Sequence, residues 1–379
     1  MPPAFRRDFI SHLGAAQAAV RGGHVSNART STLYNQWANF CAPLHVDHQL
    51  QTPGLPKIEL LQVYGYRVRD GHYSTRCSVR ADSVAAAWRA VAEVHLLEGL
   101  PDPRKPPGSS SKDLDKRLSR MLRHYSYQDP PSKREKAIPL GMVISIGASA
   151  DGSPKASCTS DLIQIALFFC LRSCEYSKTS SHRRTTQFRY RDLQFHNAEG
   201  VIPGDAPDHV FLSATAVTLF LDTQKNCVRG ESTSMEATGL KHGDSVKAAA
   251  RRFLHLRTNN ADPATPICCY FHDASGIPAS INSQHITATL RLEASKIGFQ
   301  KLGFYPHEIG SHSLRSGGAM TLHLAGISEH TIKIIGRWRS DAFLIYLQGQ
   351  IASFTKGVAA AMAKVQWFKH TAPSPMPTA

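Results

Sequence analysis

Two stretches near the C-terminus decide the fold: Gly310-Ser-His-Ser-Leu-Arg-Ser-Gly-Gly-Ala-Met320 and Gly336-Arg-Trp-Arg-Ser-Asp-Ala-Phe-Leu-Ile-Tyr346. In the first, His312 and Arg315 are three residues apart, so at the start of a helix both can project from one side. The second ends in Tyr346, eight residues after Trp338. The phenol of Tyr346 can act as a nucleophile, the imidazole of His312 can transfer protons, and the guanidinium of Arg315 can bind an anion.

Two earlier segments carry further polar candidates. Arg172 follows a long apolar run, and an unpaired guanidinium is costly to bury, so we expect it to have a partner or a ligand. Glu175 could pair with it or act in catalysis, and we favour the pairing. Lys225 lies in a predicted hairpin turn and competes with Lys241 for a catalytic role. We prefer Lys225 because it closely follows an apolar, β-branched strand.

In this order, the four segments resemble the tyrosine recombinase (phage integrase) family. The form Gly-Arg-Trp-x-Ser-Asp-Ala-Phe-Leu-x-Tyr is most similar to recombinases of eukaryotic DIRS-like and Crypton-like mobile elements. The resemblance covers nearly the whole chain and implies a mainly α fold with a small antiparallel β-sheet (α+β). It implies a helical core-binding (SAM-like) DNA-binding domain at 1–130 and a catalytic domain at 141–370. The polar, Pro-broken stretch 131–140 is the expected linker, and 371–379 the expected disordered tail.

The resemblance implies a chemistry that fits these residue types. Tyr346 would attack a DNA phosphate and form a 3′-phosphotyrosyl bond. Arg172 and Arg315 would hold the non-bridging oxygens, because guanidinium groups match phosphate geometry and stay charged. Lys225 would protonate the leaving 5′-oxygen, and His312 would contact the phosphate and assist proton transfer. Since the covalent link preserves the bond energy, no cofactor and no metal are expected.

The chain departs from the family at two positions. Many members carry His where Arg337 stands, and others use Trp in that role. Either Arg337 or Trp338 could therefore supply the last phosphate contact, and we prefer Trp338, which would donate its indole N–H or pack the site. Ser316 stands where His is common. Neither change removes one of the expected core residues.

The charge balance favours a polyanionic partner. The 379 residues carry a net charge of +15, and each Lys or Arg near a phosphate releases condensed counterions. A basic helix is expected at 112–124. The DNA-binding candidates are Lys116, Arg117, Arg120 and Arg123 on this helix, together with Arg337. On charge alone, a basic protein without a nucleic-acid role fits equally well, and it is the resemblance to tyrosine recombinases that implies double-stranded DNA as the partner.

Periodicity predicts the remaining elements. Helices are expected at 30–40, 83–97, 159–172, 245–256, 283–298, 313–325, 328–336 and 341–348, with Asp82 or Ser83 as the cap of the second. Strands are expected around 188–191, at 210–212 and at 217–221, with turn chemistry at 200–204. The eight cysteines form no metal-binding pattern, so we expect reduced, mostly buried thiols without disulfides or zinc.

The family suggests a homo-tetramer on two DNA sites and a monomer or dimer when free. A helix at 351–368 could dock onto a neighbouring subunit. No apolar run reaches the ~20 residues of a membrane helix, and no signal peptide is apparent, so no membrane role is expected. The expected location is the nucleus if the source is eukaryotic and the cytoplasm otherwise. The alternatives are a type IB topoisomerase and a catalytically silent integrase-derived DNA-binding protein.

Overall fold

The computed structural model describes residues 12–13, 16, 28–74, 78–106, 113–131, 135–150, 152–179, 185–221, 230–272 and 276–344. The chain divides into two compact units, Met1–Ser132 and Lys133–Ala379, each with its own apolar core. The division falls inside the interval 131–140 that the sequence suggests as a linker. Ile138, in the same interval, is only 1% exposed and packs in the second core, so the later part of the interval belongs to the second unit.

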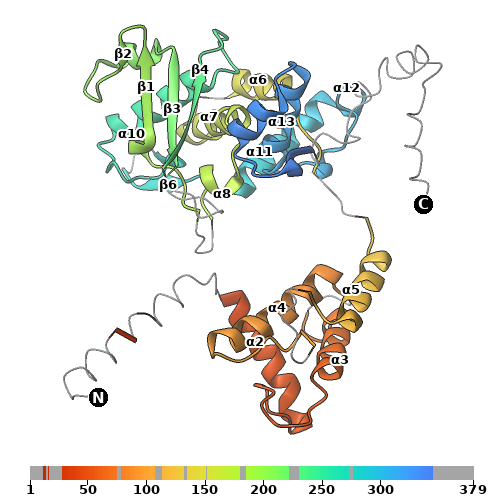
Figure 1. Ribbon diagram of the computed structural model, residues 1–379. Coiled ribbons are helices and arrows are strands. Elements are labelled where there is room, and N and C mark those ends of the chain that lie inside the picture. Colours follow the sequence, from red (N-terminus) through yellow and green to blue (C-terminus); the bar gives the residue numbers. More distant parts are fainter. Residues whose placement is uncertain are drawn as a thin grey trace, which may run out of the picture. The chain divides into compact units, whose positions relative to one another are not determined.

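The first unit is built from helices (Figure 1). They are α2 (Ala28–Cys41), η1 (Ala42–Leu44), α3 (Lys57–Arg69), α4 (Ala81–Leu97) and α5 (Lys116–Gln128). The helices predicted at 30–40 and 83–97 are confirmed, whereas α3 was not predicted. Trp37 and Tyr64 pack edge to face at 5.2 Å in the core. Trp88 donates its indole N–H to Leu61 O at 2.8 Å and lies against Gly65, where a Cβ would meet the ring.

The caps of α4 and α5 differ in origin. Neither Asp82 nor Ser83 caps α4, because the helix begins earlier, at Ala81, whose N–H donates to Asp129 Oδ2 at 2.9 Å. Asp129 follows α5, so this cap comes from a distant part of the chain. Helix α5 begins at Lys116 instead of 112, since the Asp115 side chain accepts from Arg117 N and starts the helix there.

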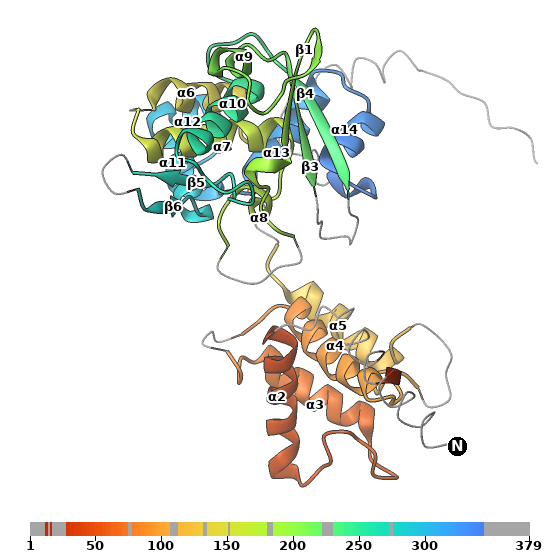
Figure 2. The ribbon, with the colours of Figure 1, turned by 90° about the vertical axis from the view of Figure 1, so that its left-hand side faces the viewer.

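The second unit is organised around α7 (Pro154–Phe168), in which all residues from 158 to 167 are buried. Figure 2 shows α6, α10, α11 and α13 gathered around it, and each of them contacts it. The helices of this unit are α6 (Leu140–Ser149), α7, α8 (Ser173–Tyr176), η2 (Tyr190–Asp192), α9 (Asp208–Leu212), α10 (Ser245–Thr258), α11 (Ser283–Ile297), α12 (Phe299–Leu302), η3 (Pro306–Glu308), α13 (Ser313–Leu324), α14 (Glu329–Gly336) and η4 (Asp341–Phe343).

A small antiparallel sheet lies beside these helices (Figure 1). Its strands are β1 (Leu193–Asn197), β2 (Gly200–Val201), β3 (Ala216–Leu221) and β4 (Glu231–Glu236), in the order β2-β1-β3-β4. A separate pair is formed by β5 (Cys269–Phe271) and β6 (Pro278–Ser280). Phe195 of β1 packs against Phe253 of α10 with ring centroids 5.3 Å apart, which joins the sheet to the helices. The predicted α+β class is confirmed.

Four local predictions need correction. Residues 210–212 are helical in α9, not a strand, and Phe211 packs against Phe253 at 4.7 Å. Around 188–191, Arg189 forms an isolated bridge to Pro266 and the chain then turns into η2. Helix α7 begins before residue 159, because Ser153 caps it, and ends before Arg172. Of the helix predicted at 341–348, Asp341–Phe343 is a 3-10 turn, and residues from 345 onward lie outside the described part.

Two bulk expectations can be compared with the described residues. The cysteines found there are buried and free: Cys41, Cys158, Cys170, Cys174, Cys268 and Cys269. Within the described ranges, no helix combines the length and the apolar character needed to cross a membrane.

Candidate active site

Arg172 lies in the bend that follows α7. Cys170 adopts a left-handed conformation (φ 47°), which turns the chain and places Arg172 at the N-cap of α8. The backbone N–H and Nη1 of Arg172 donate to the two carboxylate oxygens of Glu175, each at 2.8 Å. Glu175 is fully buried, while the Arg172 side chain keeps 17% of its surface exposed. The pairing of Arg172 with Glu175 expected from the sequence is therefore present.

Arg315 connects this bend to the end of α14. Its side chain is buried (2% exposed), donates from Nη1 to Cys170 O, and donates from Nη2 to Gly336 O at 2.6 Å. The guanidinium lies over the Trp338 ring, 4.2 Å from its centroid. Burial, together with repulsion from Arg172, lowers the pKa of Arg315 to about 10. The group is therefore close to other cations and still charged at neutral pH.

Arg337 joins the same cluster from the C-terminal end of α14. It is the C-cap of that helix, in a left-handed conformation (φ 55°), with a side chain only 4% exposed. Its Nη2 donates to Glu175 Oε2 at 2.8 Å. Trp338 packs against Phe343, with ring centroids 6.0 Å apart. The structure thus pairs Arg172 and Arg337 with Glu175, and it places Arg315 close to them, over the ring of Trp338.

His312 stands at the N-cap of α13, and its side chain is exposed. Its carbonyl oxygen accepts from Arg315 N at 3.1 Å, so the two residues share the first turn of the helix. The residue before it, Ser311, is held in place because the Tyr176 hydroxyl donates a hydrogen bond to Ser311 O at 3.0 Å. Ser316 points inward and donates to Ser313 O at 3.1 Å. Of these residues, His312 is therefore the one that faces solvent beside the arginine cluster.

The two glycines after Ser316 let α13 approach its neighbours. A Cβ at Gly317 would lie 2.5 Å from Ile138 O, and a Cβ at Gly318 would overlap Leu167 O. This Gly-Gly pair leaves no space for a side chain at either contact. It admits the backbone of α7 and of the segment before α6, and this contact sets the depth at which Arg315 enters the core.

Two expected catalytic residues, Lys225 and Tyr346, lie outside the described residues. Lys241, the alternative to Lys225, is exposed in the turn before α10. Of the residues expected in the site, the structure therefore describes Arg172, His312, Arg315, Arg337 and Trp338.

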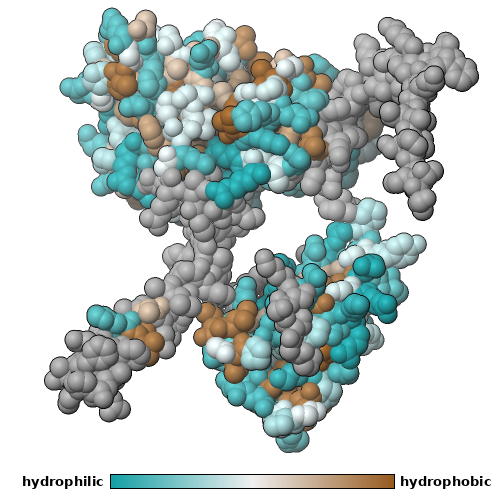
Figure 3. Space-filling view, in the orientation of Figure 1, coloured by the Kyte–Doolittle hydropathy of each residue, from teal (hydrophilic) through white to brown (hydrophobic). Residues whose placement is uncertain are grey.

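The basic candidates of the first unit lie on the exposed side of α5. Leu118 and Tyr125 bury the opposite side. Figure 3 shows a mainly hydrophilic surface over α5. Arg117 pairs with Glu59 at 2.6 Å and with Asp115 at 3.0 Å, so its charge is already partly neutralised. The other exposed candidates are Lys116, Arg120 and Arg123.

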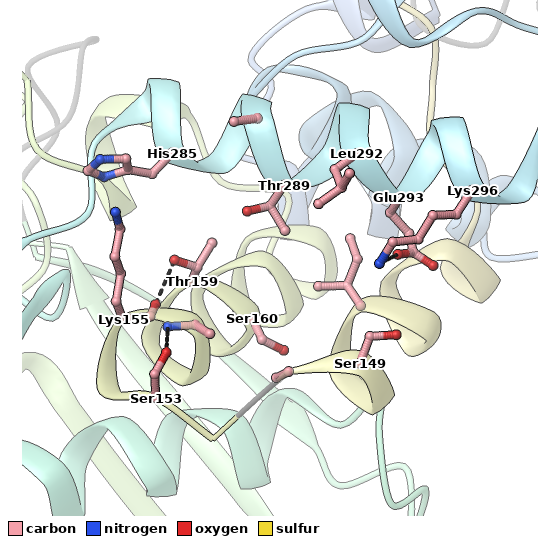
Figure 4. A pocket seen from close by; sticks show the side chains of 14 residues that line it. Ser149, Ser153, Lys155, Thr159, Ser160, His285, Thr289, Leu292, Glu293 and Lys296 are labelled. Carbon is pink, nitrogen blue, oxygen red and sulfur yellow. Dashed lines mark hydrogen bonds and ion pairs between the residues drawn. The ribbon is translucent and has the colours of Figure 1, made fainter.

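A pocket of about 390 Å³ lies elsewhere in the second unit, between α6, α7 and α11 (Figure 4). Lys155 and His285 stand at one end, and Glu293 and Lys296 at the other. Burial lowers the pKa of His285, and the nearby Lys155 charge adds to this effect. Of the expected site residues that the structure describes, none lines this pocket.

The link between Glu175 and Arg337 was not predicted. The two residues are 162 positions apart, and no periodic pattern or local motif connects them. A buried acidic residue three positions after Arg172 indicated a local ion pair, but not a second guanidinium on the same carboxylate.

No protein-family model matches the chain, and no curated protein matches it. Among solved structures, it is similar to the Tn1549 transposon integrase in complex with transposon right-end DNA, with 11% identity, 92% of this chain and 97% of that chain covered, and a TM-score of 0.46. It is also similar to the XerH site-specific recombinase bound to a palindromic difH substrate, with 12% identity, 82% of this chain and 73% of that chain covered, and a TM-score of 0.48. A third similar structure is a lambda integrase dimer bound to a COC′ core site, with 11% identity, 96% of this chain and 99% of that chain covered, and a TM-score of 0.46. Because these TM-scores are below 0.5, the functional proposal rests on the residues of this chain.

Proposed function

We propose that this protein is a site-specific DNA recombinase or integrase that cuts and rejoins strands through a 3′-phosphotyrosyl intermediate at Tyr346. One observation carries the proposal. Two arginines from separate segments, Arg172 and Arg337, share the single buried carboxylate of Glu175, and a third, Arg315, is buried close to them. The cluster therefore has an excess of positive charge. The segment that supplies Arg337 continues to Tyr346, the expected nucleophile.

The charge of the cluster suits the proposed transition state. Three guanidinium groups against one carboxylate leave two positive charges in excess. Attack on a phosphodiester produces a phosphorane with two negative charges, so this excess can stabilise the transition state more than the ground state. Arg172 is the partly exposed member, and its remaining N–H groups are available to a phosphate oxygen. Arg315 remains protonated at neutral pH because its pKa of about 10 is still well above 7.

The remaining steps are assigned by residue type. Tyr346 displaces the 5′-oxygen, and its phenolic proton passes to a base that we assign to His312, which is exposed beside Arg315. Lys225 gives a proton to the leaving 5′-oxygen. In the reverse direction, a different 5′-hydroxyl attacks the phosphotyrosine and gives its proton back to Lys225, while His312 returns a proton to the departing Tyr346 oxygen. The two directions together exchange strands without loss of the phosphoester bond energy.

The first unit would serve as the core-binding domain, with α5 against the DNA backbone. We further propose a homo-tetramer on two DNA sites, in line with the strand-exchange chemistry. The Gly336-to-Tyr346 motif favours a mobile-element recombinase of the DIRS-like or Crypton-like type, which would act in the nucleus of a eukaryotic source. These finer assignments depend on the sequence resemblance.

The decisive experiment traps the covalent intermediate. Purified protein is incubated with a pool of nicked duplexes of random sequence, in which cleavage releases a short strand and prevents rejoining. We expect an SDS-resistant protein–DNA adduct that is lost in Tyr346→Phe and strongly reduced in Arg315→Ala. Binding without an adduct would identify a silent DNA-binding protein. Relaxation of supercoiled plasmid without recombination between two selected sites would identify a type IB topoisomerase.

A further inference from the structure

Arg337 is an unusual residue for the position it occupies. It ends α14 in the left-handed conformation (φ 55°), which glycine adopts at little cost and a long side chain does not. Its side chain is nonetheless turned inward and is 4% exposed. The Nε–H is buried and has no hydrogen-bond partner among the described residues. Backbone strain and an unsatisfied buried donor both cost stability, so the presence of arginine here points to a role in function.

The contacts of Arg337 indicate what that role is. Nη2 donates to Glu175 Oε2 at 2.8 Å, and Nη1 points back to Ile335 O at 3.5 Å. The same Glu175 Oε2 accepts the backbone N–H of Arg172, and Oε1 accepts Nη1 of Arg172, both at 2.8 Å. One carboxylate therefore holds two arginines. Arg337 is on its buried side, and Arg172 is on the side that reaches the surface.

A direct contact between Arg337 and DNA does not fit this geometry. The Arg337 side chain is only 4% exposed to solvent, whereas the Arg172 side chain is 17% exposed. Without Arg337, the carboxylate of Glu175 would lose one of its two cations and could rotate. Arg172 would then lose the fixed acceptor that sets the direction of its free N–H groups.

We infer that Arg337 is a positioning residue that orients Arg172 through Glu175 and does not itself touch the DNA. This inference rests on the proposed function. Arg337 lies nine residues before Tyr346, so the bridge also joins the segment that carries the nucleophile to the arginine that binds the phosphate. A phosphate-binding arginine is thereby aligned when the C-terminal end of α14 is in place.

A double-mutant cycle tests the inference in the full chain, with the random-sequence nicked duplexes as the probe. The rate of covalent adduct formation is measured at saturating protein. We expect Arg337→Ala to slow it by about tenfold or more, the loss that one charge-assisted hydrogen bond represents. In the Arg172→Ala background, the same change should alter the rate by less than about twofold, because the residue through which it acts is gone.

Three further measurements separate positioning from a structural role. Arg337→Lys should recover part of the rate, since an ammonium can still pair with Glu175, and Glu175→Gln should resemble Arg337→Ala. DNA affinity and its salt dependence should be unchanged in Arg337→Ala, as expected for a residue without a phosphate contact. Arg191→Ala, an exposed arginine in η2, is the matched control and should keep the wild-type rate. If melting shows that Arg337→Ala is unfolded, Arg337→Gln replaces it in the cycle.

The outcomes distinguish the two proposals. If the wild-type protein forms no adduct, the proposed function fails. If the wild type forms one, but the losses of Arg337→Ala and Arg172→Ala multiply, Arg337 acts independently and the positioning inference is overturned. A wild-type rate in Arg337→Ala would overturn it as well.

Discussion

The backbone of Gly318 in α13 rests directly on the carbonyl oxygen of Leu167 in α7, with no room for a Cβ between them. Leu167 is three residues before Cys170, whose carbonyl accepts a hydrogen bond from Arg315. This close approach of the two helices thus lies within one turn of Cys170. It fixes the distance between the segment that supplies Arg315 and the bend that supplies Arg172.

Gly318→Ala should therefore destabilise the second unit and disturb the site. Overpacking in a dense core costs about 1–3 kcal/mol, and here the obstacle is backbone, which cannot move aside as a side chain can. We expect a lower melting temperature and slower covalent adduct formation. The control is Gly141→Ala, at an exposed position in α6 with no atom within 4 Å of the new Cβ. It should leave stability unchanged or raise it by up to about 1 kcal/mol. Equal effects of the two variants would contradict the close-packing account.

Trp338 can act in two ways, and one pair of variants tells them apart. Its ring lies 4.2 Å from the Arg315 guanidinium, an arrangement worth about 0.5–2 kcal/mol. If the ring serves mainly to hold Arg315, Trp338→Phe should keep most of the cleavage rate, and Trp338→Ala should lose about tenfold. If instead the indole N–H donates to the phosphate, Trp338→Phe should be as slow as Trp338→Ala. Single-turnover adduct formation measures both.

The sequence could predict those relations in the candidate site that join residues close together along the chain. His312 and Arg315 share one helical turn, and Trp338 follows Gly336, whose missing side chain leaves room for the indole. Such relations depend on spacing along the chain. The pairing of Arg337 with Glu175 depends on how α14 and α8 pack in three dimensions, and neither residue type nor spacing encodes that contact.

In the fold, too, elements set by local sequence were predicted and elements set by packing were missed. Helix α14 was predicted well because Ser328 is a strong cap and the apolar residues that follow have helical spacing. Strand β4 was missed because Glu-Ser-Thr-Ser-Met-Glu has no apolar alternation, and only its pairing with β3 makes it a strand. In α9, Val210 and Phe211 favour a strand by propensity, but the packing of Phe211 against α10 overrides that preference.

Asp129 should make the stability of the first unit sensitive to acid. Burial pushes its pKa upward, but hydrogen bonds from Arg69 and from Ala81 N–H outweigh this and hold the pKa below its usual range. A depressed pKa in the folded state contributes stability above the unfolded value of about 3.9, and this contribution is lost as the pH falls through the folded pKa. We therefore expect the protection factors of the α4 amides, which compare their exchange with that of an unstructured chain at the same pH, to fall below about pH 4.

The variant Asp129→Asn checks this assignment. At neutral pH it should destabilise the unit by about 1–2 kcal/mol, because both the cap of α4 and the ion pair with Arg69 are weakened. Its additional loss on acidification should be smaller than that of the wild type. Asp82→Asn is the matched control, since Asp82 is exposed in the first turn of α4 and does not cap it. A larger effect at Asp82 would show that the cap has been misassigned.

The basic residues of α5 should differ in their contribution to DNA binding, although all are exposed. Arg120 and Arg123 have no ion pair within the described part of the chain, so each can neutralise a phosphate. Replacing either by Ala should weaken binding to duplex DNA and reduce the slope of log K against log salt by about 1. Arg117→Ala should change the slope much less, because that guanidinium already pairs with Asp115 and Glu59. Fluorescence anisotropy at several salt concentrations measures the slopes. An equal loss of slope in all three variants would mean that DNA displaces the carboxylates from Arg117, and unchanged slopes would place the DNA on another face of the unit.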